Sequence, residues 1–259
     1  MRSPETISES PQIDESTSEV KPEVKSLSRR DFIAQLNLRM KNLFCPVGEA
    51  YLKSPQKRGL DILGSIILFP FTTPFIAGAA AAIKLEDRGQ VFYFAHVVGK
   101  GKEKFGMFKL RSMKESQGRN NGRSANSSWT KLNDQRITNV GKFIRQWSID
   151  ELPQLVNILH GEMSLIGNRP MFQERIEHLS SVPQLRDLYP TWIQTYKIAK
   201  PGAAGLAVSR GRHSLDETVQ GHRNRMRYDI FYITHASLGF DLKLIIDTTE
   251  AALSRRGSY

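Results

Sequence analysis

The stretch GLDILGSIILFPFTTPFIAGAAAAIKL, from Gly59 to Leu85, decides the fold of this chain. Within it only Asp61 and Lys84 are charged, and as a helix it is long enough to cross a hydrocarbon layer of ~30 Å. The alternative is a buried core helix of a soluble protein, but such helices are usually shorter. The sequence therefore predicts a membrane segment over residues 57–86.

Two prolines and the flanking charges argue against a straight membrane span. Pro70 and Pro74 interrupt the helical hydrogen bonding near the middle of the segment. Basic residues flank it on both sides: Lys53, Lys57 and Arg58 before it, and Arg88, Lys100, Lys102, Lys104, Lys109 and Arg111 after it. Because basic flanks favour the cytoplasm, we expect a re-entrant helical hairpin bent at Thr73 and Pro74. The hydroxyls of Thr72 and Thr73 should bond carbonyls that the bend leaves without partners.

The chain before this segment divides into two parts. Residues 1–28 are rich in Ser, Glu and Pro with an excess of acids, which predicts a disordered acidic tail without the order of a secretory signal. Residues 29–56 are expected to form a basic amphipathic helix, with Ser28 as its cap, and a linker. Whether this helix packs on the domain or lies on an anionic bilayer stays open.

Composition narrows the function classes. The 259 residues carry a formal net charge of +11, which indicates a polyanionic partner such as nucleic acid, an anionic membrane or a phosphorylated substrate. Cys45 is the single cysteine, so a disulfide framework and a thiolate zinc cluster are excluded, and the six histidines lack metal-ligand spacing. A nucleic-acid-binding protein is an alternative, but no recognisable module supports it and the apolar segment fits it poorly.

Residues 87–259 are expected to form a cytoplasmic catalytic domain. The segments 90–99 and 105–113 are short and β-prone, which predicts a hairpin. On a strand, Lys109 and Arg111 would face the same side and could grip one phosphate. The polar stretch 115–133 is predicted to be a mobile loop, either a lid or plain disorder.

The segment GKFIRQWSIDELPQLVNIL, Gly141 to Leu159, holds the candidate chemistry. Its apolar residues have helical spacing and predict one buried stripe: Leu152, Leu155, Val156 and Leu159. Ser148 and Glu151 have the spacing of a capping box, which would place Asp150 and Glu151 at a helix N-terminus.

At such a position the helix dipole favours ionised carboxylates. Asp150 would then be a deprotonated nucleophile, and the adjacent carboxylates would suit a divalent cation. Arg145, about one turn upstream, could neutralise a phosphate. A simple helix cap with solvated acids is the alternative that the spacing leaves open.

Five blocks in one order resemble the bacterial sugar transferase family, the polyprenyl-phosphate phosphoglycosyl transferases of the monotopic type with a re-entrant membrane helix. The blocks are KRGLDILGSIILFPFTTPF (57–75), GMFKLRSM (106–113), GKFIRQWSIDELPQLVNILHGEMSLIGNRP (141–170), KPGAAGLAVSRGR (200–212) and RYDIFYITHASLGFDLKLII (227–246). The resemblance covers about three quarters of the chain, from Lys57 to Leu253.

The resemblance implies an enzyme, a phosphoglycosyl transferase that initiates glycan assembly, such as exopolysaccharide or lipopolysaccharide synthesis. Asp150 would attack a UDP-sugar, release UMP and form a covalent phosphosugar that polyprenyl (undecaprenyl) phosphate then accepts. Glu151 is expected to hold Mg²⁺. Further candidates for phosphate or nucleotide contacts are Lys109, Arg111, Arg145, Arg169, Pro170, Arg212 and Asp229.

The implied fold is α/β. A re-entrant membrane helix would lead into a compact, mainly helical cytoplasmic domain with a small sheet and membrane-surface amphipathic helices. The C-terminal apolar positions from Phe240 to Leu253 could lie along the membrane or pack in the core. The expected location is the cytoplasmic face of the bacterial inner (plasma) membrane. Expected partners are the UDP-sugar, polyprenyl phosphate, membrane lipid and downstream glycosyltransferases, with a homodimer left open and no nucleic acid.

Three departures from the family pattern support an alternative. Asn168 stands where the family turn usually has proline, Leu206 stands where tryptophan is usual, and residues 208–210 read Val-Ser-Arg. A catalytically weak, membrane-bound partner in glycan assembly is therefore the second hypothesis.

Overall fold

The computed structural model describes residues 46–114, 134–209 and 218–253, all within one compact unit. The tail predicted over residues 1–28, the amphipathic helix predicted from Ser28 and the loop predicted over residues 115–133 lie outside the described residues, and so does Arg212.

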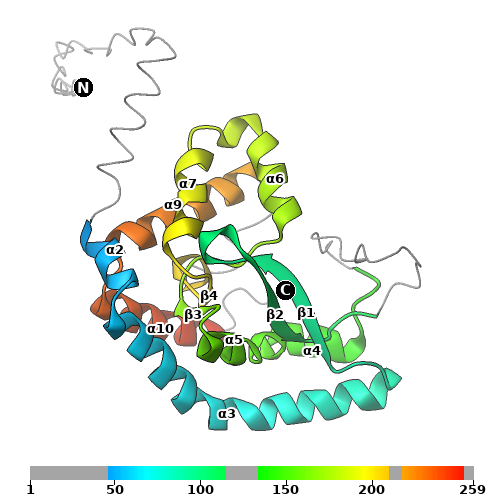
Figure 1. Cartoon of the computed structure of the whole chain (residues 1–259). Helices are drawn as coiled ribbons and strands as arrows, with labels where there is room; N and C mark the ends of the chain where they lie inside the picture. Colours follow the sequence, from blue (N-terminus) through cyan, green and yellow to red (C-terminus); the bar gives the residue numbers. More distant parts are fainter. Residues whose placement is uncertain (1–45, 115–133, 210–217, 254–259) are drawn as a thin grey trace, which may run out of the picture. The chain divides into compact units, whose positions relative to one another are not determined.

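Helices dominate the described chain, and the strands are few and short (Figure 1). The elements in chain order are α2 (Pro46–Leu52), α3 (Pro55–Asp87), β1 (Phe92–Val98), η1 (Lys100–Lys102), β2 (Lys104–Leu110), α4 (Asn139–Gln146), η2 (Ile149–Glu151), α5 (Gln154–His160), β3 (Ser164–Ile166), α6 (Gln173–Ser181), η3 (Pro183–Leu185), α7 (Tyr189–Ile198), β4 (Gly202–Ala204), α8 (Leu206–Ser209), α9 (Val219–His235) and α10 (Leu238–Leu253).

The apolar stretch forms α3, the one helix of the described residues that is long and apolar enough to cross a membrane. Ser54 caps its start by accepting a hydrogen bond from the Lys57 amide at 3.2 Å, and Pro55 begins the helix. The helix continues through both internal prolines, and its axis changes direction along its length (Figure 1). The structure thus contains one curved helix, and the re-entrant hairpin stays a prediction.

The hydroxyls near the middle of α3 bond to a backbone carbonyl, but not to one that a proline leaves without its amide partner, because the residue four positions beyond Phe69 is Thr73. Thr72 and Thr73 both donate to the carbonyl of Phe69, at 3.0 Å and 2.7 Å. Such hydroxyl-to-carbonyl bonds one turn back bend helices, and Pro74 lacks the amide that would close the next turn. The bend therefore has two local causes, which lie in adjacent residues.

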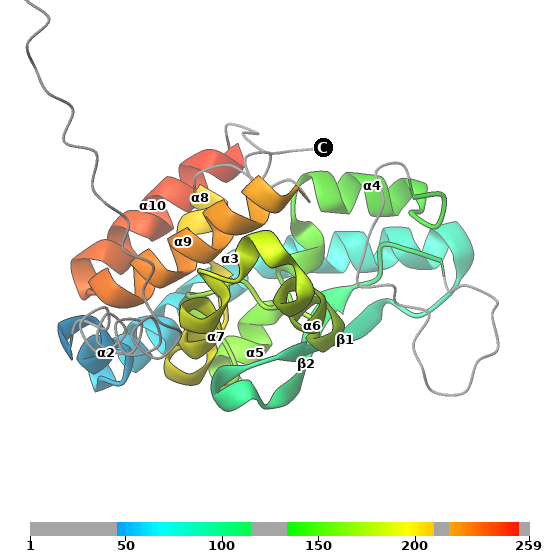
Figure 2. The ribbon, with the colours of Figure 1, turned by 90° about the horizontal axis from the view of Figure 1, so that it is seen from above.

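Both halves of α3 pack on the same domain, and its middle does not. Lys57, Asp61 and Ser65 are buried near the start, and Ala79 and Ile83 are buried near the end. The end packs against α4, which lies alongside it in Figure 2. Large apolar side chains between these two zones are exposed: Ile66, Ile67, Leu68, Phe69, Phe71 and Phe75.

Two small sheets complete the domain. Strands β1 and β2 pair antiparallel, with Phe92 opposite Leu110 and Val98 opposite Lys104, which confirms the predicted hairpin. Strands β3 and β4 pair in parallel, with Ser164 opposite Gly202. The largest apolar cluster of the core joins both sheets to α5, α9 and α10.

The last helix, α10, has a buried and an exposed face. Asp241 and Leu244 are fully buried, whereas Leu238, Leu242 and Ile246 are exposed at intervals of four residues, which places them along one face. One of the two alternatives for this segment, packing in the core, is thereby confirmed. Contact of its exposed face with a membrane stays a prediction.

Candidate active site

The candidate nucleophile lies on a short turn between two helices. Helix α4 ends at Gln146, and Ser148 then adopts a left-handed backbone with φ 57° and ψ 23°. Asp150 and Glu151 follow on the 3₁₀ turn η2, and α5 begins only at Gln154. The predicted capping box is wrong, because the Ser148 side chain makes no capping hydrogen bond at this turn.

The late start of α5 also moves its buried face. The predicted stripe counted Leu152 as part of a helix, but that residue precedes α5 and is only partly buried. Val156 and Leu159 are likewise only partly buried. The buried face consists instead of Gln154, Leu155, Asn157 and Ile158. The 3₁₀ turn has a different number of residues per turn, so periodicity counted across it gives the wrong phase.

The two carboxylates differ in exposure. Asp150 is buried, with 8% of its surface exposed, and Glu151 is partly buried. Lys109 of β2 donates to the Glu151 carboxylate at 3.0 Å, and about a fifth of each side chain is exposed. The chain thus brings together three of the predicted site residues from two segments, with a lysine ammonium beside the carboxylate pair.

The other two predicted cations of this region have separate partners. Arg111, just beyond β2, pairs with Asp87 at the end of α3. Arg145 of α4 donates to the hydroxyl of Ser112 at 2.9 Å. Lys109 and Arg111 thus pair with carboxylates on different elements, and their joint contact with one phosphate stays a prediction.

Asn157 is a supporting residue that sequence reasoning missed. Its side-chain oxygen accepts from the Phe108 amide at 2.8 Å, and its side-chain amide donates to the Gly106 carbonyl at 2.9 Å. The side chain thus bonds to the free edge of β2 as a neighbouring strand would. It fixes the strand that carries Lys109 against the helix that follows Glu151. The predicted stripe does not include Asn157, so the helical pattern carried no signal for this role.

The remaining predicted residues belong to a second, buried region. The pKa of Asp229, which accepts from the Trp192 indole at 2.8 Å, is raised to about 7 by burial, although that bond and the charges of Arg225 and Arg169 oppose the rise. The Arg169 carbonyl accepts a hydrogen bond from Tyr196 at 2.8 Å, and both Arg169 and the following Pro170 are partly buried. Asp229 is thus an interior residue of α9 that contacts α7, and its contact with a nucleotide stays a prediction.

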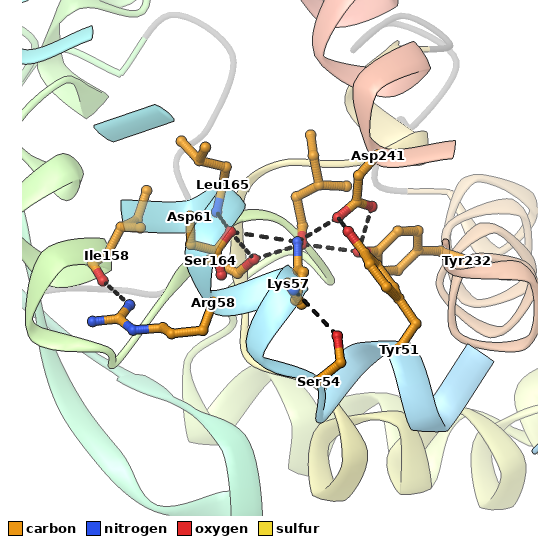
Figure 3. Close-up of polar contacts among 11 residues, drawn as sticks. Tyr51, Ser54, Lys57, Arg58, Asp61, Ile158, Ser164, Leu165, Tyr232 and Asp241 are labelled. Atoms are coloured by element: carbon orange, nitrogen blue, oxygen red, sulfur yellow. Dashed lines mark hydrogen bonds and ion pairs between the residues drawn. The ribbon is translucent and has the colours of Figure 1, made fainter. Parts of the chain in front are cut away.

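A buried polar cluster anchors the start of α3 (Figure 3). The Lys57 ammonium donates to Asp241 of α10 at 2.6 Å and lies 3.4 Å from Asp61. Asp241 also accepts from the hydroxyls of Tyr51 and Tyr232, each at 2.9 Å. Every charge of the cluster therefore has a charged or hydrogen-bonding partner, as burial at this depth requires.

The same turn of α3 holds the segments that lead to the candidate site. Lys57 donates to the Ile166 carbonyl at 3.0 Å and Asp61 accepts from the Leu165 amide at 3.0 Å, so both grip β3, which runs toward Arg169. Arg58 donates to the carbonyls of Ile158 and Leu159, at 2.6 Å and 2.7 Å, at the end of α5 (Figure 3 shows the first). The first turns of α3 therefore hold β3 and α5, the two elements that lead to and from the candidate site.

The carboxylate pair fits the ligand chemistry of Mg²⁺. Among the described residues there is no group of three or more His, Cys, Asp or Glu side chains placed to hold a metal. Mg²⁺ does not need one, because it commonly takes one or two carboxylates and completes its shell with water and substrate phosphates. Asp150 and Glu151 supply that minimal set.

The residues that depart from the family pattern are part of the interior. Asn168 is buried, and its side-chain amide donates to the Thr195 hydroxyl at 2.6 Å. Leu206 packs in the main core. Leu206 is thus accommodated by packing, whereas the side-chain oxygen of Asn168 is buried without a hydrogen-bond partner among the described residues.

Comparison with known proteins identifies the family. The family model described as bacterial sugar transferase matches residues 52–255. A UDP-N-acetylgalactosamine-undecaprenyl-phosphate N-acetylgalactosaminephosphotransferase of Aeromonas hydrophila is 35% identical over 78% of this chain and 44% of its own length. A UDP-glucose:undecaprenyl-phosphate glucose-1-phosphate transferase of Caulobacter vibrioides is 36% identical over 79% of this chain and 72% of its own length.

A third relative, the exopolysaccharide production protein ExoY of Sinorhizobium fredii, is 32% identical over 79% of this chain and 88% of its own length. The chain therefore spans less than half of the Aeromonas relative but most of the other two. The match to the family model and these identities lead to one conclusion: the chain belongs to the bacterial sugar transferase family.

Proposed function

We propose that this chain transfers a sugar 1-phosphate from a UDP-sugar to polyprenyl phosphate and so starts the assembly of a glycan. The observation that carries the proposal is the Asp150–Glu151 pair, held on a turn beside Lys109 and next to α3. Two relatives, which are named as undecaprenyl-phosphate sugar transferases, support this reaction class.

The first step is a displacement at phosphorus. A carboxylate oxygen of Asp150 attacks the β-phosphorus of the UDP-sugar, the bond from that phosphorus to the bridging oxygen breaks, and UMP leaves with the electron pair. The product is an acyl phosphate that joins Asp150 to the phosphosugar. Burial of Asp150 keeps water away from this intermediate.

The second step returns the enzyme to its starting state. A phosphate oxygen of polyprenyl phosphate attacks the same phosphorus, and the acyl-phosphate bond breaks. This releases a polyprenyl diphosphate sugar and the free Asp150 carboxylate, and the product would pass to downstream glycosyltransferases. Glu151 would hold Mg²⁺, which when bound supplies charge neutralisation for the diphosphate. Lys109 lies within reach to take over part of the phosphate charge.

The proposed location is the cytoplasmic face of the plasma membrane. Basic residues flank α3 on both sides, and both halves of the helix pack on one domain. A re-entrant course of α3, which enters and leaves the bilayer on the same side, meets both conditions. The exposed apolar middle of the helix would then be the part in contact with lipid.

The reaction is tested by UMP release from detergent-purified protein with polyprenyl phosphate, Mg²⁺ and a panel of UDP-sugars. Asp150→Asn should abolish UMP release while the melting temperature stays close to that of the wild type, because an amide cannot act as the nucleophile. Glu151→Gln should lower the rate and shift the Mg²⁺ titration together. Normal turnover by Asp150→Asn would contradict the covalent scheme, and silence of folded wild-type protein across the panel would favour the non-catalytic partner.

A further inference from the structure

Helix α4 lies alongside the second half of α3 (Figure 2), and the last turn of α3 reaches its start. The exposed Glu86 carboxylate accepts hydrogen bonds from the amides of Asn139 and Val140, at 2.8 Å and 3.3 Å. These amides belong to the first turn of α4, where a helix offers no carbonyl of its own. The next amide, that of Gly141, bonds to the Thr138 hydroxyl at 2.8 Å. Glu86 thus joins the end of α3 to the helix that precedes the candidate site.

Backbone hydrogen bonds continue from α4 into the turn that carries Asp150. The amides of Trp147 and Ser148 donate to carbonyls of α4, at 3.3 Å and 3.1 Å. The Glu151 amide then donates to the Ser148 carbonyl at 3.1 Å. Helix and turn are therefore one hydrogen-bonded unit, so a rotation of α4 moves Asp150 with it.

This unit has close neighbours on two sides. Ile144 and Ile149 pack in one apolar cluster with the end of α3. The backbone of Gly141 lies so close to Ser112, just beyond β2, that a Cβ there would come within 2.0 Å of the Ser112 carbonyl oxygen. Apolar contacts have no preferred direction, whereas hydrogen bonds do. Glu86, which bonds to two amides at once, is therefore placed to select the orientation of α4 on α3.

Small rotations of α4 matter at its far end. The eight residues of α4 span ~12 Å, so a tilt of ~5° moves that end by ~1 Å. A misplacement of ~1 Å at the reacting group can slow a reaction on the order of 100-fold. The orientation of α4 is thus a quantity on which attack by Asp150 depends.

We propose that Glu86 is a positioning residue of the candidate site: its carboxylate fixes the orientation of α4 and, through α4, the place of Asp150. This inference rests on the proposed function, since it takes Asp150 as the nucleophile. The next residue, Asp87, pairs with Arg111 just beyond β2, the strand that carries Lys109. Two consecutive acids at the end of α3 therefore reach both chain segments of the candidate site.

Three variants of the full chain test the proposal. Glu86→Met removes the acceptor and keeps a side chain of similar length, and Glu86→Gln keeps one acceptor oxygen without the charge. Glu103→Met is the matched control, because Glu103 is also exposed and its side chain forms no hydrogen bond or ion pair within the described part of the chain. Since water can replace the carboxylate at an exposed helix start, melting temperatures in detergent should stay close to wild type for all three.

Amide hydrogen exchange, followed by mass spectrometry without substrate, measures the reach of Glu86. Glu86→Met should lose protection at the first turn of α4, residues 139–142, and also at the turn over residues 147–151. Glu86→Gln and Glu103→Met should keep the protection of wild type. Loss of protection confined to residues 139–142 would make Glu86 a helix cap alone and overturn the proposal.

The burst of UMP without acceptor then measures the effect on the reaction. Its rate constant is followed against UDP-sugar concentration in the presence of Mg²⁺. We expect Glu86→Met to lower the maximal rate constant about tenfold or more with an unchanged half-saturating donor concentration, because displacement of the nucleophile slows attack and leaves donor binding intact. Glu86→Gln should restore most of the rate.

A maximal rate constant of Glu86→Met equal to that of Glu103→Met would overturn the positioning role. Absence of UMP from wild type would instead overturn the proposed function, and the exchange result would still decide whether Glu86 orders the turn.

Discussion

Ser148 is the residue at which the chain leaves α4 and enters the turn that carries Asp150. Its φ of 57° lies in the left-handed region, which side chains other than glycine enter at a cost of about 1–2 kcal/mol. The following turn then places Ile149 against the apolar cluster at the end of α3 and Asp150 in a buried position. The backbone at one serine thus sets the direction of the candidate nucleophile.

Substitutions at Ser148 should separate backbone strain from side-chain chemistry. Ser148→Gly should leave the melting temperature and UMP release near wild type, because glycine adopts the left-handed region freely. Ser148→Val should destabilise by about 1 kcal/mol or more and slow UMP release, since β-branched residues are least compatible with this region. Thermal unfolding and the UMP burst measure the two effects, and equal behaviour of the two variants would show that the left-handed turn is unimportant.

Asp229 makes stability depend on pH. Its folded pKa of about 7 lies above the ordinary value of 3.8, because burial disfavours the charged form. The folded chain therefore binds more protons than the unfolded chain between about pH 4 and pH 7. Its contribution to stability is fully present below that window and is lost as pH rises through it, at up to about 1.4 kcal/mol per pH unit.

The variant Asp229→Asn should remove this part of the pH dependence. Asparagine can still accept the hydrogen bond from Trp192 and cannot ionise. Melting temperatures between pH 5 and pH 8 should therefore fall less for the variant than for wild type. Parallel curves for the two proteins would show that Asp229 stays ionised, or stays neutral, across the whole range.

At the scale of elements, α3 joins two kinds of environment. Its first turns are tied by buried polar contacts to α10, β3 and α5, whereas its middle presents large apolar side chains outward. Of the residues 57–86 predicted as a membrane segment, the first turns belong to the domain interior. Lys57 contacts both α10 and β3 in that interior.

Removal of the Lys57 ammonium should weaken the attachment of α3. Lys57→Met leaves the buried carboxylates of Asp61 and Asp241 without their cation, which should cost about 3–5 kcal/mol. Lys53→Met is the matched control, because Lys53 pairs with Glu49 at the surface and 57% of its side chain is exposed, so a change below about 1 kcal/mol is expected. Thermal unfolding in detergent compares the variants, and similar losses for both would refute the anchoring role.

Several elements were predictable because their signals are local. The length and apolarity of α3 and the β-prone hairpin both follow from neighbouring residues. The capping box at Ser148 was predicted wrongly, since spacing carries no information about a left-handed backbone. The contact of Lys57 with Asp241 joins residues 184 positions apart, and such a pairing depends on how the elements pack.

At the scale of the whole molecule, the two halves of α3 return to one domain. The helix start is buried beside β3 and α10, and the helix end is buried against α4 and β2. Ile149, which precedes the candidate nucleophile, packs against the second half. This arrangement supports a helix whose two ends remain on the same side of a bilayer.

Thiol labelling tests that topology. After replacement of Cys45, single cysteines are introduced at Gln56 and Gln90, which are exposed residues beyond or near the two ends of α3. On spheroplasts, a membrane-impermeant maleimide should label neither site, and both should become labelled after lysis. A helix that spans the bilayer would instead expose one of the two sites before lysis.

The attachment of both halves of α3 to one domain has a consequence for biogenesis. On the proposed topology, no charged segment has to be translocated, and only the apolar middle of the helix enters the hydrocarbon. The basic flanks, whose transfer across the bilayer would be costly, stay on the cytoplasmic side throughout synthesis. The apolar middle of α3 can then enter one leaflet while the domain folds. No loop has to be exported across the membrane.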